Sequence, residues 1–223
     1  MVVVTGAAGA LGSAVVADLV ARGAEVVAMD RDSSALDDLG NTTGVRTIGV
    51  NLADRTDVVR AWEEVDEVGI PTALIALAGG FTPGSLADLD ESDFDMLWSG
   101  NVATVLWNAQ QSARRMAAAG GGAIVTVGSK TAVTGSGPVA HASSKAAVVR
   151  VTELLAEELR PAGVRVNTVL PSVLDTPANR TWMSADLASR AVSTFAVAKV
   201  IAFLISPESE PISGARIPVY GRS

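Results

Sequence analysis

Short runs of β-branched and other apolar residues alternate along the chain with longer segments in which apolar residues recur at helical spacing. The short runs predict strands at residues 2–5, 26–30, 45–50, 74–78, 123–127, 164–169 and 216–219. The longer segments predict helices at residues 11–22, 56–65, 93–118, 141–160 and 192–205. Strands that alternate with helices are typical of repeated βαβ units. The pattern therefore predicts an α/β protein with a doubly wound, seven-stranded parallel sheet and helices on both faces.

The chain has 223 residues, which is enough for one well-buried α/β domain and too few for two ordinary ones. Hydrophobic residues make up 48% of it and aromatic residues 4%, so the core is expected to be aliphatic. The least regular segment, residues 172–190, follows the sixth predicted strand. Because substrates bind beyond the carboxyl ends of such strands, this segment is either a substrate lid or a plain surface connection.

Charge and residue types exclude several classes of function. The 24 acidic and 17 basic residues give a net charge of −7, which disfavours binding to nucleic acid or to an anionic membrane surface. The chain has no cysteine and one histidine, so we expect no disulfide and no cysteine- or histidine-rich metal site. It begins without the basic segment of a signal peptide. These features predict a cytoplasmic protein that acts on a small molecule.

A glycine-rich turn lies between the first predicted strand and the first predicted helix. Gly6, Gly9 and Gly12, with Leu11 before the last of them, have the spacing of turns that hold a pyrophosphate. Glycine permits the tight turn and a close approach of the backbone, and the start of a helix favours negative charge. The turn therefore predicts a dinucleotide site.

The second and third predicted strands end in residues suited to an adenosine moiety. Asp30 can accept hydrogen bonds from ribose hydroxyls and would repel a ribose phosphate, which favours NAD(H). The neighbouring Arg31 can pair with a phosphate, which keeps NADP(H) open. Asn51 and Leu52 are placed to flank the adenine, although an asparagine here can equally cap a loop.

Further along the chain, a series of landmarks occurs in a fixed order, and these landmarks resemble the short-chain dehydrogenase/reductase family over essentially the whole length. They are the glycine turn, Ala78-Gly79-Gly80, Asn101, Ser129, a motif ending at Lys145, Arg165-Val166-Asn167, Pro171, and the segments 212–215 and 219–221. The resemblance implies a Rossmann-type fold and a nicotinamide dinucleotide held also by Ala78, Gly79, Lys145, Pro171 and Thr176. It further implies a homodimer or homotetramer formed by the helices at 93–118 and 141–160, with Leu106, Ala146 and Val149 on the outer sides.

Within this family, three segments are similar to quinonoid dihydropteridine reductases. They are the glycine turn, residues 77–81 (LAGGF) and residues 170–180 (LPSVLDTPANR). That branch uses NADH, which agrees with the preference expected from Asp30.

The resemblance also implies catalytic roles. In the family a serine polarises the substrate carbonyl, a tyrosine transfers the proton, a lysine binds the nicotinamide ribose, and an asparagine holds a water of the proton relay. Ser129, Lys145 and Asn101 match three of these positions, and His141 occupies the position of the tyrosine.

The chemistry of His141 leaves two interpretations open. Its ordinary pKa suits proton transfer near neutral pH, and on a helix it lies one turn from Lys145. However, a nearby ammonium lowers the pKa of the imidazole, and the shorter ring stops short of the position of a phenol oxygen. His141 is therefore either an adapted catalyst or a replacement without a catalytic role.

The leading hypothesis is an NAD(H)-dependent oxidoreductase that transfers hydride to or from a small carbonyl, imine or pterin-like substrate. The alternative is a degenerate family member that binds the dinucleotide without redox turnover, as a sensor, a scaffold or a non-redox cyclase or isomerase. Retention of Ser129, Lys145 and Asn101 favours the first, and His141 favours the second. Phe81, Trp182 and Met183 can line an apolar pocket or serve as ordinary packing.

Overall fold

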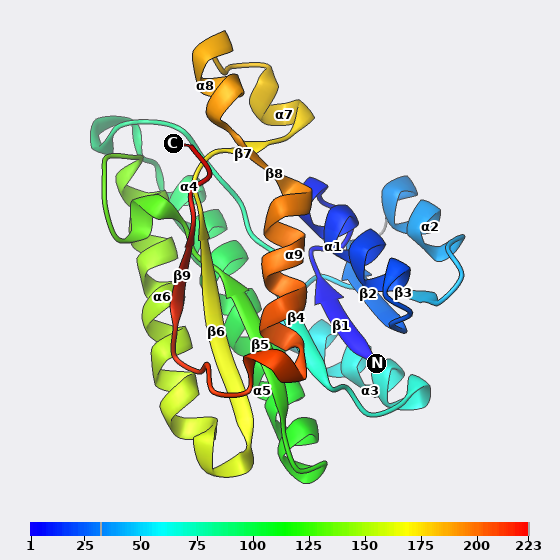
Figure 1. Ribbon diagram of the computed structural model, residues 1–223. Helices are drawn as coiled ribbons and strands as arrows, with labels where there is room; N and C mark the ends of the chain where they lie inside the picture. Colours follow the sequence, from blue (N-terminus) through cyan, green and yellow to red (C-terminus); the bar gives the residue numbers. More distant parts are fainter. Residues whose placement is uncertain (32, 223) are drawn as a thin grey trace.

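The centre of the protein is a parallel sheet of seven strands, shown in the computed structural model of Figure 1, which describes residues 1–31 and 33–222. Its seven parallel strands confirm the predicted doubly wound sheet, and their order is β3-β2-β1-β4-β5-β6-β9. The strands are β1 (Val2–Thr5), β2 (Val26–Asp30), β3 (Val45–Gly49), β4 (Ala73–Ala76), β5 (Gly122–Val127), β6 (Val164–Pro171) and β9 (Arg216–Val219). The order reverses between β1 and β4, and the crevice at their carboxyl ends is the place where such sheets bind ligands.

Helices cover both faces of the sheet. One face carries α1 (Ala10–Ala21) and α9 (Thr194–Ile205), which lie against each other (Figure 1). The opposite face carries α3 (Arg55–Val68), α5 (Thr104–Ala118) and α6 (Val139–Leu159). The helix α2 (Ser34–Gly40), beside β2 and β3, is not apparent from the sequence pattern because it is short and buries one side chain, Leu36.

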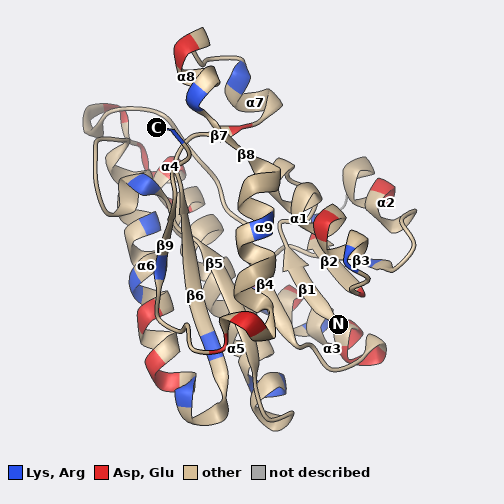
Figure 2. Ribbon diagram, viewed as in Figure 1, with Lys and Arg blue, Asp and Glu red and all other residues tan. Residues whose placement is uncertain are grey.

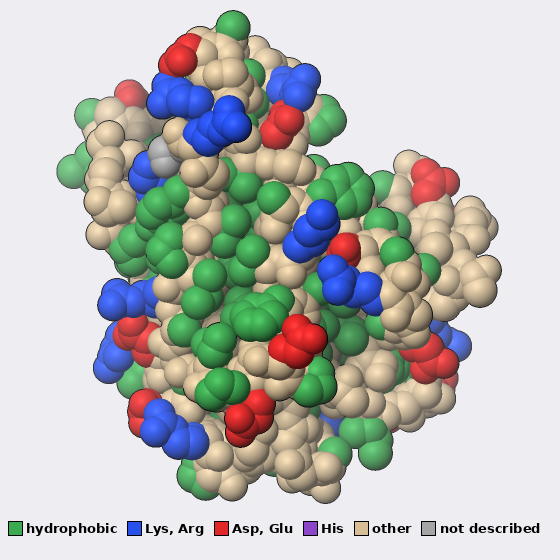
Figure 3. All heavy atoms as spheres, viewed as in Figure 1, with side chains coloured by type: hydrophobic (Ala, Val, Ile, Leu, Met, Phe, Trp, Pro, Cys, Tyr) green, Lys and Arg blue, Asp and Glu red, His purple; other side chains and the backbone are tan. Residues whose placement is uncertain are grey.

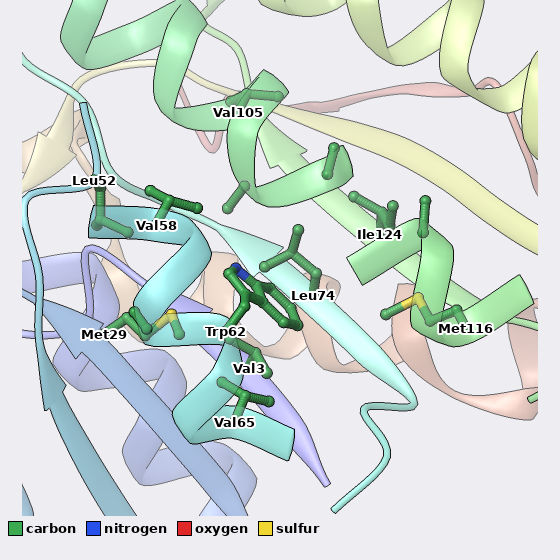
Figure 4. Close-up of a cluster of buried hydrophobic side chains, with 14 of the residues drawn as sticks. Val3, Met29, Leu52, Val58, Trp62, Val65, Leu74, Val105, Met116 and Ile124 are labelled. Carbon is green, nitrogen blue, oxygen red and sulfur yellow. The ribbon is translucent and has the colours of Figure 1, made fainter. Parts of the chain in front are cut away.

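The side chains of each strand alternate between two hydrophobic cores. Val3 and Leu74 point into the core beneath α3, α5 and α6, where Trp62 is the largest of the fully buried side chains (Figure 4). Its indole nitrogen donates to Asn108 Oδ1 at 2.9 Å, so the polar end of the ring is satisfied. Val4 and Ile75 point into the other core, beneath α1 and α9. Both cores are otherwise mainly aliphatic, as the composition predicts.

The helix expected at 93–118 is interrupted. It consists of α4 (Glu91–Trp98), a π-helical segment η2 (Ser99–Ala103) and α5. A π-helical turn inserts one additional residue into the hydrogen-bonded spiral and changes the direction of the side chains that follow. Asn101 lies within this segment.

The segment 172–190 contains more regular structure than its composition suggests. It forms β7 (Leu174–Asp175), α7 (Pro177–Arg180) and α8 (Ala185–Arg190), and β7 pairs in parallel with β8 (Val192–Ser193) in a sheet of its own. Val192 is therefore part of β8, and α9 begins two residues later than expected. In Figure 1 this segment projects beyond the carboxyl ends of the central strands. Substrates bind at this end of such sheets, and the choice between a lid and a plain surface connection stays a prediction.

The remaining short elements are single turns of 3₁₀ helix: η1 (Leu86–Asp88), η3 (Lys130–Ala132), η4 (Arg160–Ala162) and η5 (Pro207–Ser209). Across residues 1–31 and 33–222, no helix is long and apolar enough to cross a membrane. The same residues include no group of three or more potential ligands placed to hold a metal ion. Basic and acidic residues are interspersed along the ribbon in Figure 2.

Candidate active site

The glycine turn brings the backbone of β1 against the chain that follows β4. Gly6 has φ +68°, and a Cβ atom there would lie 2.6 Å from the backbone nitrogen of Ala78. A Cβ atom at Gly12 would lie 2.1 Å from the carbonyl oxygen of Gly6. Both positions therefore require glycine, whereas a Cβ atom at Gly9 would make an ordinary contact of 3.4 Å. Leu11 lies in the first turn of α1, half-buried against the core on this face.

Helix α1 begins without a side-chain cap. Its N-cap residue, Gly9, has no side chain that accepts a hydrogen bond, while α2, α3, α4, α7 and α8 are each capped by a serine, threonine or aspartate side chain. The N–H groups in the first turn of α1 thus lack the side-chain partner that these five helices have. An anion placed at the glycine turn would meet these N–H groups and the positive end of the helix dipole.

Asp30 is tied to the glycine turn. One carboxylate oxygen accepts from the backbone nitrogen of Ala8 at 3.0 Å, and the other accepts from that of Arg31 at 2.8 Å. The carboxylate therefore stands beside the turn, with lone pairs left for a further donor. Arg31 is exposed next to it.

The end of β3 differs from the sequence-based expectation. Leu52 is 6% exposed and belongs to the hydrophobic core beneath α3, α5 and α6, so its side chain does not face an adenine site. Asn51 is exposed, and its Oδ1 accepts from the backbone nitrogen of Ala53 at 3.2 Å. In this structure Asn51 thus caps a loop, which was the alternative that the sequence left open.

Asn101 connects three parts of the site. Its Oδ1 accepts from the backbone nitrogen of Gly80 at 2.8 Å, and its Nδ2 donates to the Gly80 carbonyl at 3.2 Å and to Ser144 Oγ at 2.9 Å. Asn101 is fully buried, and these bonds satisfy its amide. A Cβ atom at Gly79 would lie 2.5 Å from Asn101 Oδ1 and 3.3 Å from Lys145 Nζ. Gly79 therefore lets the chain after β4 pass close to both side chains.

Lys145 lies one residue after Ser144 on α6. Its Nζ donates to the carbonyl oxygen of Val127 at 3.0 Å, at the end of β5. Burial of the ammonium lowers the pKa of Lys145 to about 8. An ammonium has three N–H donors, and among the described residues Val127 is the acceptor recorded for Nζ, so two donors remain for hydroxyl groups of a ligand.

Ser129 follows β5 by two residues and begins η3. Its Oγ accepts from the backbone nitrogen of Thr131 at 3.2 Å and forms a hydrogen bond with the Thr131 hydroxyl at 2.9 Å. Ser129 thus caps the turn. Ser129 is also only two residues along the chain from Val127, whose carbonyl oxygen accepts the hydrogen bond from Lys145.

His141 lies in the first turn of α6, one helical turn before Lys145, and is 9% exposed. Its ring meets the edge of Phe81 with centroids 4.9 Å apart and an interplanar angle of 73°. Nδ1 is buried without a hydrogen-bond partner in the described part of the chain. Burial, and then the charge of Lys145, lower the pKa of His141 to about 4, so the ring is neutral at physiological pH.

The remaining predicted residues lie around the carboxyl ends of the strands. Pro171 ends β6 and is buried, and the hydroxyl of Thr176 caps α7 by accepting from the backbone nitrogen of Asn179 at 3.1 Å. Phe81 and Trp182 are 54% and 55% exposed. Met183 is half-buried in the segment beyond β6. Phe81 touches the site through His141, and no contact with the site is described for Trp182 or Met183.

Two residues of the site are not identified from the sequence. Ser144 joins Asn101 to α6, accepting from Asn101 and donating to the carbonyl of His141 at 2.9 Å. Its position immediately before Lys145, on a helix with apolar neighbours, is the signal that was available. Val127 contributes a backbone oxygen, which a sequence pattern does not reveal.

The sheet order, the uncapped turn at its switch point and the polar cluster at its carboxyl edge define the class of doubly wound α/β proteins with a nucleotide-type crevice. The model of the short-chain dehydrogenase family matches residues 1–187. The chain belongs to this family of oxidoreductases.

Relatives and a solved structure resemble the chain over nearly its whole length. L-xylulose reductase of Mesocricetus auratus is 33% identical over 233 residues, covering 98% of this chain and 93% of that protein. Galactitol 2-dehydrogenase (L-tagatose-forming) of Cereibacter sphaeroides is 28% identical over 234 residues, covering 98% and 92%. The structure of 3-ketoacyl-(acyl-carrier-protein) reductase of Brucella melitensis complexed with NADH has a TM-score of 0.92 and 25% identity, covering 99% and 96%.

Proposed function

We propose that this protein is a nicotinamide dinucleotide-dependent oxidoreductase that interconverts a small alcohol and the corresponding carbonyl compound. The observation that carries the proposal is the convergence of Lys145 and Asn101 on Gly79 and Gly80, at the carboxyl edge of the sheet. The buried ammonium of Lys145 has N–H donors to spare, and it lies beside Gly79, where a larger residue would not fit. This arrangement suits a ligand rich in hydroxyl groups.

The residues present fit the dinucleotide. The uncapped start of α1 and the turn at Gly6 and Gly12 would hold the pyrophosphate, and Asp30 would accept from the adenosine ribose. Lys145 would donate to the nicotinamide ribose, and Ala78, Gly79, Pro171 and Thr176 would border it. The bound dinucleotide would supply the hydride acceptor or donor.

We propose NAD(H) as the preferred form, because the carboxylate of Asp30 stands where a ribose phosphate would be repelled. Arg31 is exposed beside it and can pair with a phosphate, so NADP(H) remains the second choice. The NADH complex of the Brucella melitensis reductase supports the general class of cofactor.

Ser129 would hydrogen-bond the reacting oxygen of the substrate, and Asn101 would hold η2 and α6 in register around the site. The resemblance to the family places a proton-transferring tyrosine at position 141, where this chain has His141. The proton-transferring residue is therefore the point at which this site differs from the family pattern.

Two substrate classes follow from different similarities. The names of the relatives, L-xylulose reductase and galactitol 2-dehydrogenase, support a sugar or polyol. The segments 77–81 and 170–180, which resemble quinonoid dihydropteridine reductases, support a pterin-like substrate. We favour the polyol class because those relatives match 98% of this chain.

The test is a combined binding and turnover measurement. Purified protein is titrated with NADH and with NADPH by cofactor fluorescence, and then assayed with polyols, ketoses, imines and a quinonoid pterin. We expect NADH binding and turnover of at least one polyol or ketose. Absence of affinity for either dinucleotide at millimolar concentration would end the enzymatic interpretation.

A second candidate function is a dinucleotide-binding protein without redox turnover, acting as a sensor, a scaffold or a non-redox cyclase or isomerase. The observation in its favour is His141, a neutral ring in the position where the family carries its proton donor. Tight NADH binding with no turnover across the whole substrate panel would support this candidate.

We further propose a cytoplasmic homodimer or homotetramer that pairs α5 and α6 with those of a partner. Leu106 on α5 and Leu154 on α6 are 37% and 51% exposed, and Ala146 is half-buried. Val149, expected on the outer side, is 5% exposed and packs near Gly128 instead. Apolar side chains also spread over the face around α9 and β9 in Figure 3. Light scattering of the purified protein measures the assembly.

A further inference from the structure

The sole tyrosine of the chain, Tyr220, lies at the carboxyl edge of the sheet. It directly follows β9, which pairs with β6 so that Val219 lies opposite Pro171. In Figure 1 the C-terminal tail ends beside this edge. The backbone nitrogen of Ser172 donates to the carbonyl of Val219 at 3.4 Å, and its hydroxyl donates to the carbonyl of Tyr220 at 3.0 Å. The backbone at Tyr220 is therefore fixed to the end of β6.

The side chain of Tyr220 extends past β6 to the turn that follows β5. The strand β6 lies between β5 and β9 in the sheet, and Lys130 belongs to η3, after β5. Lys130 Nζ lies 5.1 Å from the centre of the Tyr220 ring, which is within the range of a cation–π contact. Both side chains are half-buried, and the ring is the partner recorded for this ammonium among the described residues.

The turn that contains Lys130 also directs the hydroxyl of Ser129, the residue before it. Ser129 Oγ accepts from the backbone nitrogen of Thr131 and shares a hydrogen bond of 2.9 Å with the Thr131 hydroxyl, in which either group can donate. Beyond η3 the chain is exposed from 133 to 137, and Gly135 there has φ +77°. A ring that restrains Lys130 therefore also restrains the backbone from which the Ser129 hydroxyl projects.

We propose that Tyr220 is a positioning residue of this site, whose ring holds Lys130 and thereby keeps the Ser129 hydroxyl directed at the reacting oxygen of the substrate. This inference rests on the proposed function and adds to it a residue that takes no part in proton transfer. The C-terminal tail, the end of β6 and the turn after β5 then form one connected support for Ser129.

The size of the effect follows from the contact itself. A catalytic group displaced by about 1 Å can lower a rate by about 10²-fold. A cation–π contact at a half-exposed position shifts an equilibrium only about two- to fivefold. The smaller of these two effects sets the expected loss, because the contact restrains the turn only as strongly as the contact itself is stable.

The first test observes the contact without requiring turnover. Because Tyr220 is the sole tyrosine, protein labelled with 3-fluorotyrosine gives a ¹⁹F resonance that needs no assignment. Lys130→Met removes the cation from the ring and should move this resonance. Lys199→Met makes the same change at an exposed lysine of α9 and should leave it in place. An unmoved resonance in Lys130→Met would overturn the contact.

The second test measures catalysis in matched variants. Tyr220→Leu and Lys130→Met should each lower kcat about two- to fivefold for a polyol that the wild-type protein oxidises, with the Kd of NADH unchanged. The double variant should lose no more than either single variant, since both act through one contact. Tyr220→Phe keeps the ring and Lys130→Arg keeps the cation, so both should retain the wild-type kcat. Thermal unfolding establishes that each variant is folded.

The outcomes separate this inference from the proposed function. Wild-type kcat in Tyr220→Leu, or additive losses in the double variant, would overturn the role of Tyr220 and leave the oxidoreductase intact. Equal losses in Tyr220→Leu and Tyr220→Phe would also overturn it, because they would assign the effect to the phenol hydroxyl instead of the ring. Absence of dinucleotide binding would overturn the proposed function itself, while the ¹⁹F resonance would still show whether the ring meets Lys130.

Discussion

Asn101 and Ser144 are joined side chain to side chain by a hydrogen bond of 2.9 Å, which ties the π-helical segment η2 to α6. Asn101 also holds Gly80 on the chain after β4. Through these two contacts one buried amide fixes the relative positions of three segments that surround Lys145. The site therefore depends on a polar connection inside the core rather than on loops at its surface.

Replacement of Asn101 by alanine should destabilise the fold as well as the site. The change leaves the backbone nitrogen of Gly80 without its acceptor, and an unsatisfied buried donor costs about 1–3 kcal/mol. Ser144→Ala is the matched control, because it leaves the bonds between Asn101 and Gly80 in place and removes only those of the Ser144 hydroxyl, to Asn101 and to the carbonyl of His141, so it should cost about 1 kcal/mol. Urea unfolding measures both. Equal stability of the two variants would show that Gly80 finds another acceptor.

Gly6→Ala should abolish dinucleotide binding and lower stability. Alanine at φ +68° is strained by about 1–2 kcal/mol, and its Cβ atom would lie 2.6 Å from Ala78. Gly9→Ala, whose Cβ atom meets only a 3.4 Å contact, should fold normally. Thermal unfolding and NADH fluorescence distinguish the two variants. A Gly6→Ala protein that binds NADH like the parent would mean that the turn rearranges without loss.

Removal of the Asp30 carboxylate should shift the cofactor preference. Asp30→Ala takes a negative charge from beside the glycine turn, so the ratio of NADPH to NADH affinity should rise about tenfold, equivalent to ~1.4 kcal/mol. Arg31→Ala should lower the same ratio, since it removes a group that can pair with phosphate. The measurement is a fluorescence titration with each dinucleotide. An unchanged ratio in both variants would place the ribose elsewhere.

His141→Tyr should raise the rate of carbonyl reduction. A phenol at position 141 can donate a proton, whereas the imidazole is neutral at physiological pH, so carbonyl reduction near neutral pH should rise at least several-fold. Initial rates of the wild-type protein and of the variant test this expectation. A collapse of reduction in the variant would show that the surroundings of position 141 have adapted to histidine.

Stability should decline in acid because of the same histidine. The pKa of His141 is near 6.5 in the unfolded chain and about 4 in the folded protein. Above pH 6.5 both states are neutral. As the pH falls from 6.5 to 4, the unfolded state binds a proton that the folded state does not, and stability is lost, by at most about 3 kcal/mol.

Urea unfolding at intervals between pH 7 and pH 4 measures this decline. His141→Gln removes the titrating group and should flatten that part of the curve, while the protonation of carboxylates remains in both proteins. Identical pH dependence of the two proteins would mean that the ring becomes solvated before unfolding.

The fold is largely predictable from the sequence because its elements alternate clearly between strand and helix patterns. The glycine turn is predictable from its place between the first strand and the first helix, whereas Asn101, Ser129, His141 and Lys145 are indicated by the resemblance to the family, and their roles stay predictions. Two of the errors concern apolar residues. Leu52 and Val149 are buried, and whether an apolar residue at a strand end or on a helix faces solvent is decided by tertiary packing.

Other features leave no pattern to detect. The π-helical segment arises from a change of hydrogen-bond register, which the residue types at Ser99–Ala103 do not specify. The pairing of Asn101 with Ser144 depends on that register, and the acceptor of Lys145 is a backbone oxygen. Such contacts require the three-dimensional arrangement.

The π-helical segment at Ser99–Ala103 determines how the side chains of α4 are rotated about the helix axis relative to those of α5. Excision of one residue from it would restore an uninterrupted α-helix and turn the upstream side chains by about 100°. The amide of Asn101 would then face away from α6, even though every residue named as catalytic would still be present. A one-residue deletion in this segment should therefore abolish the proposed activity as fully as the loss of Lys145.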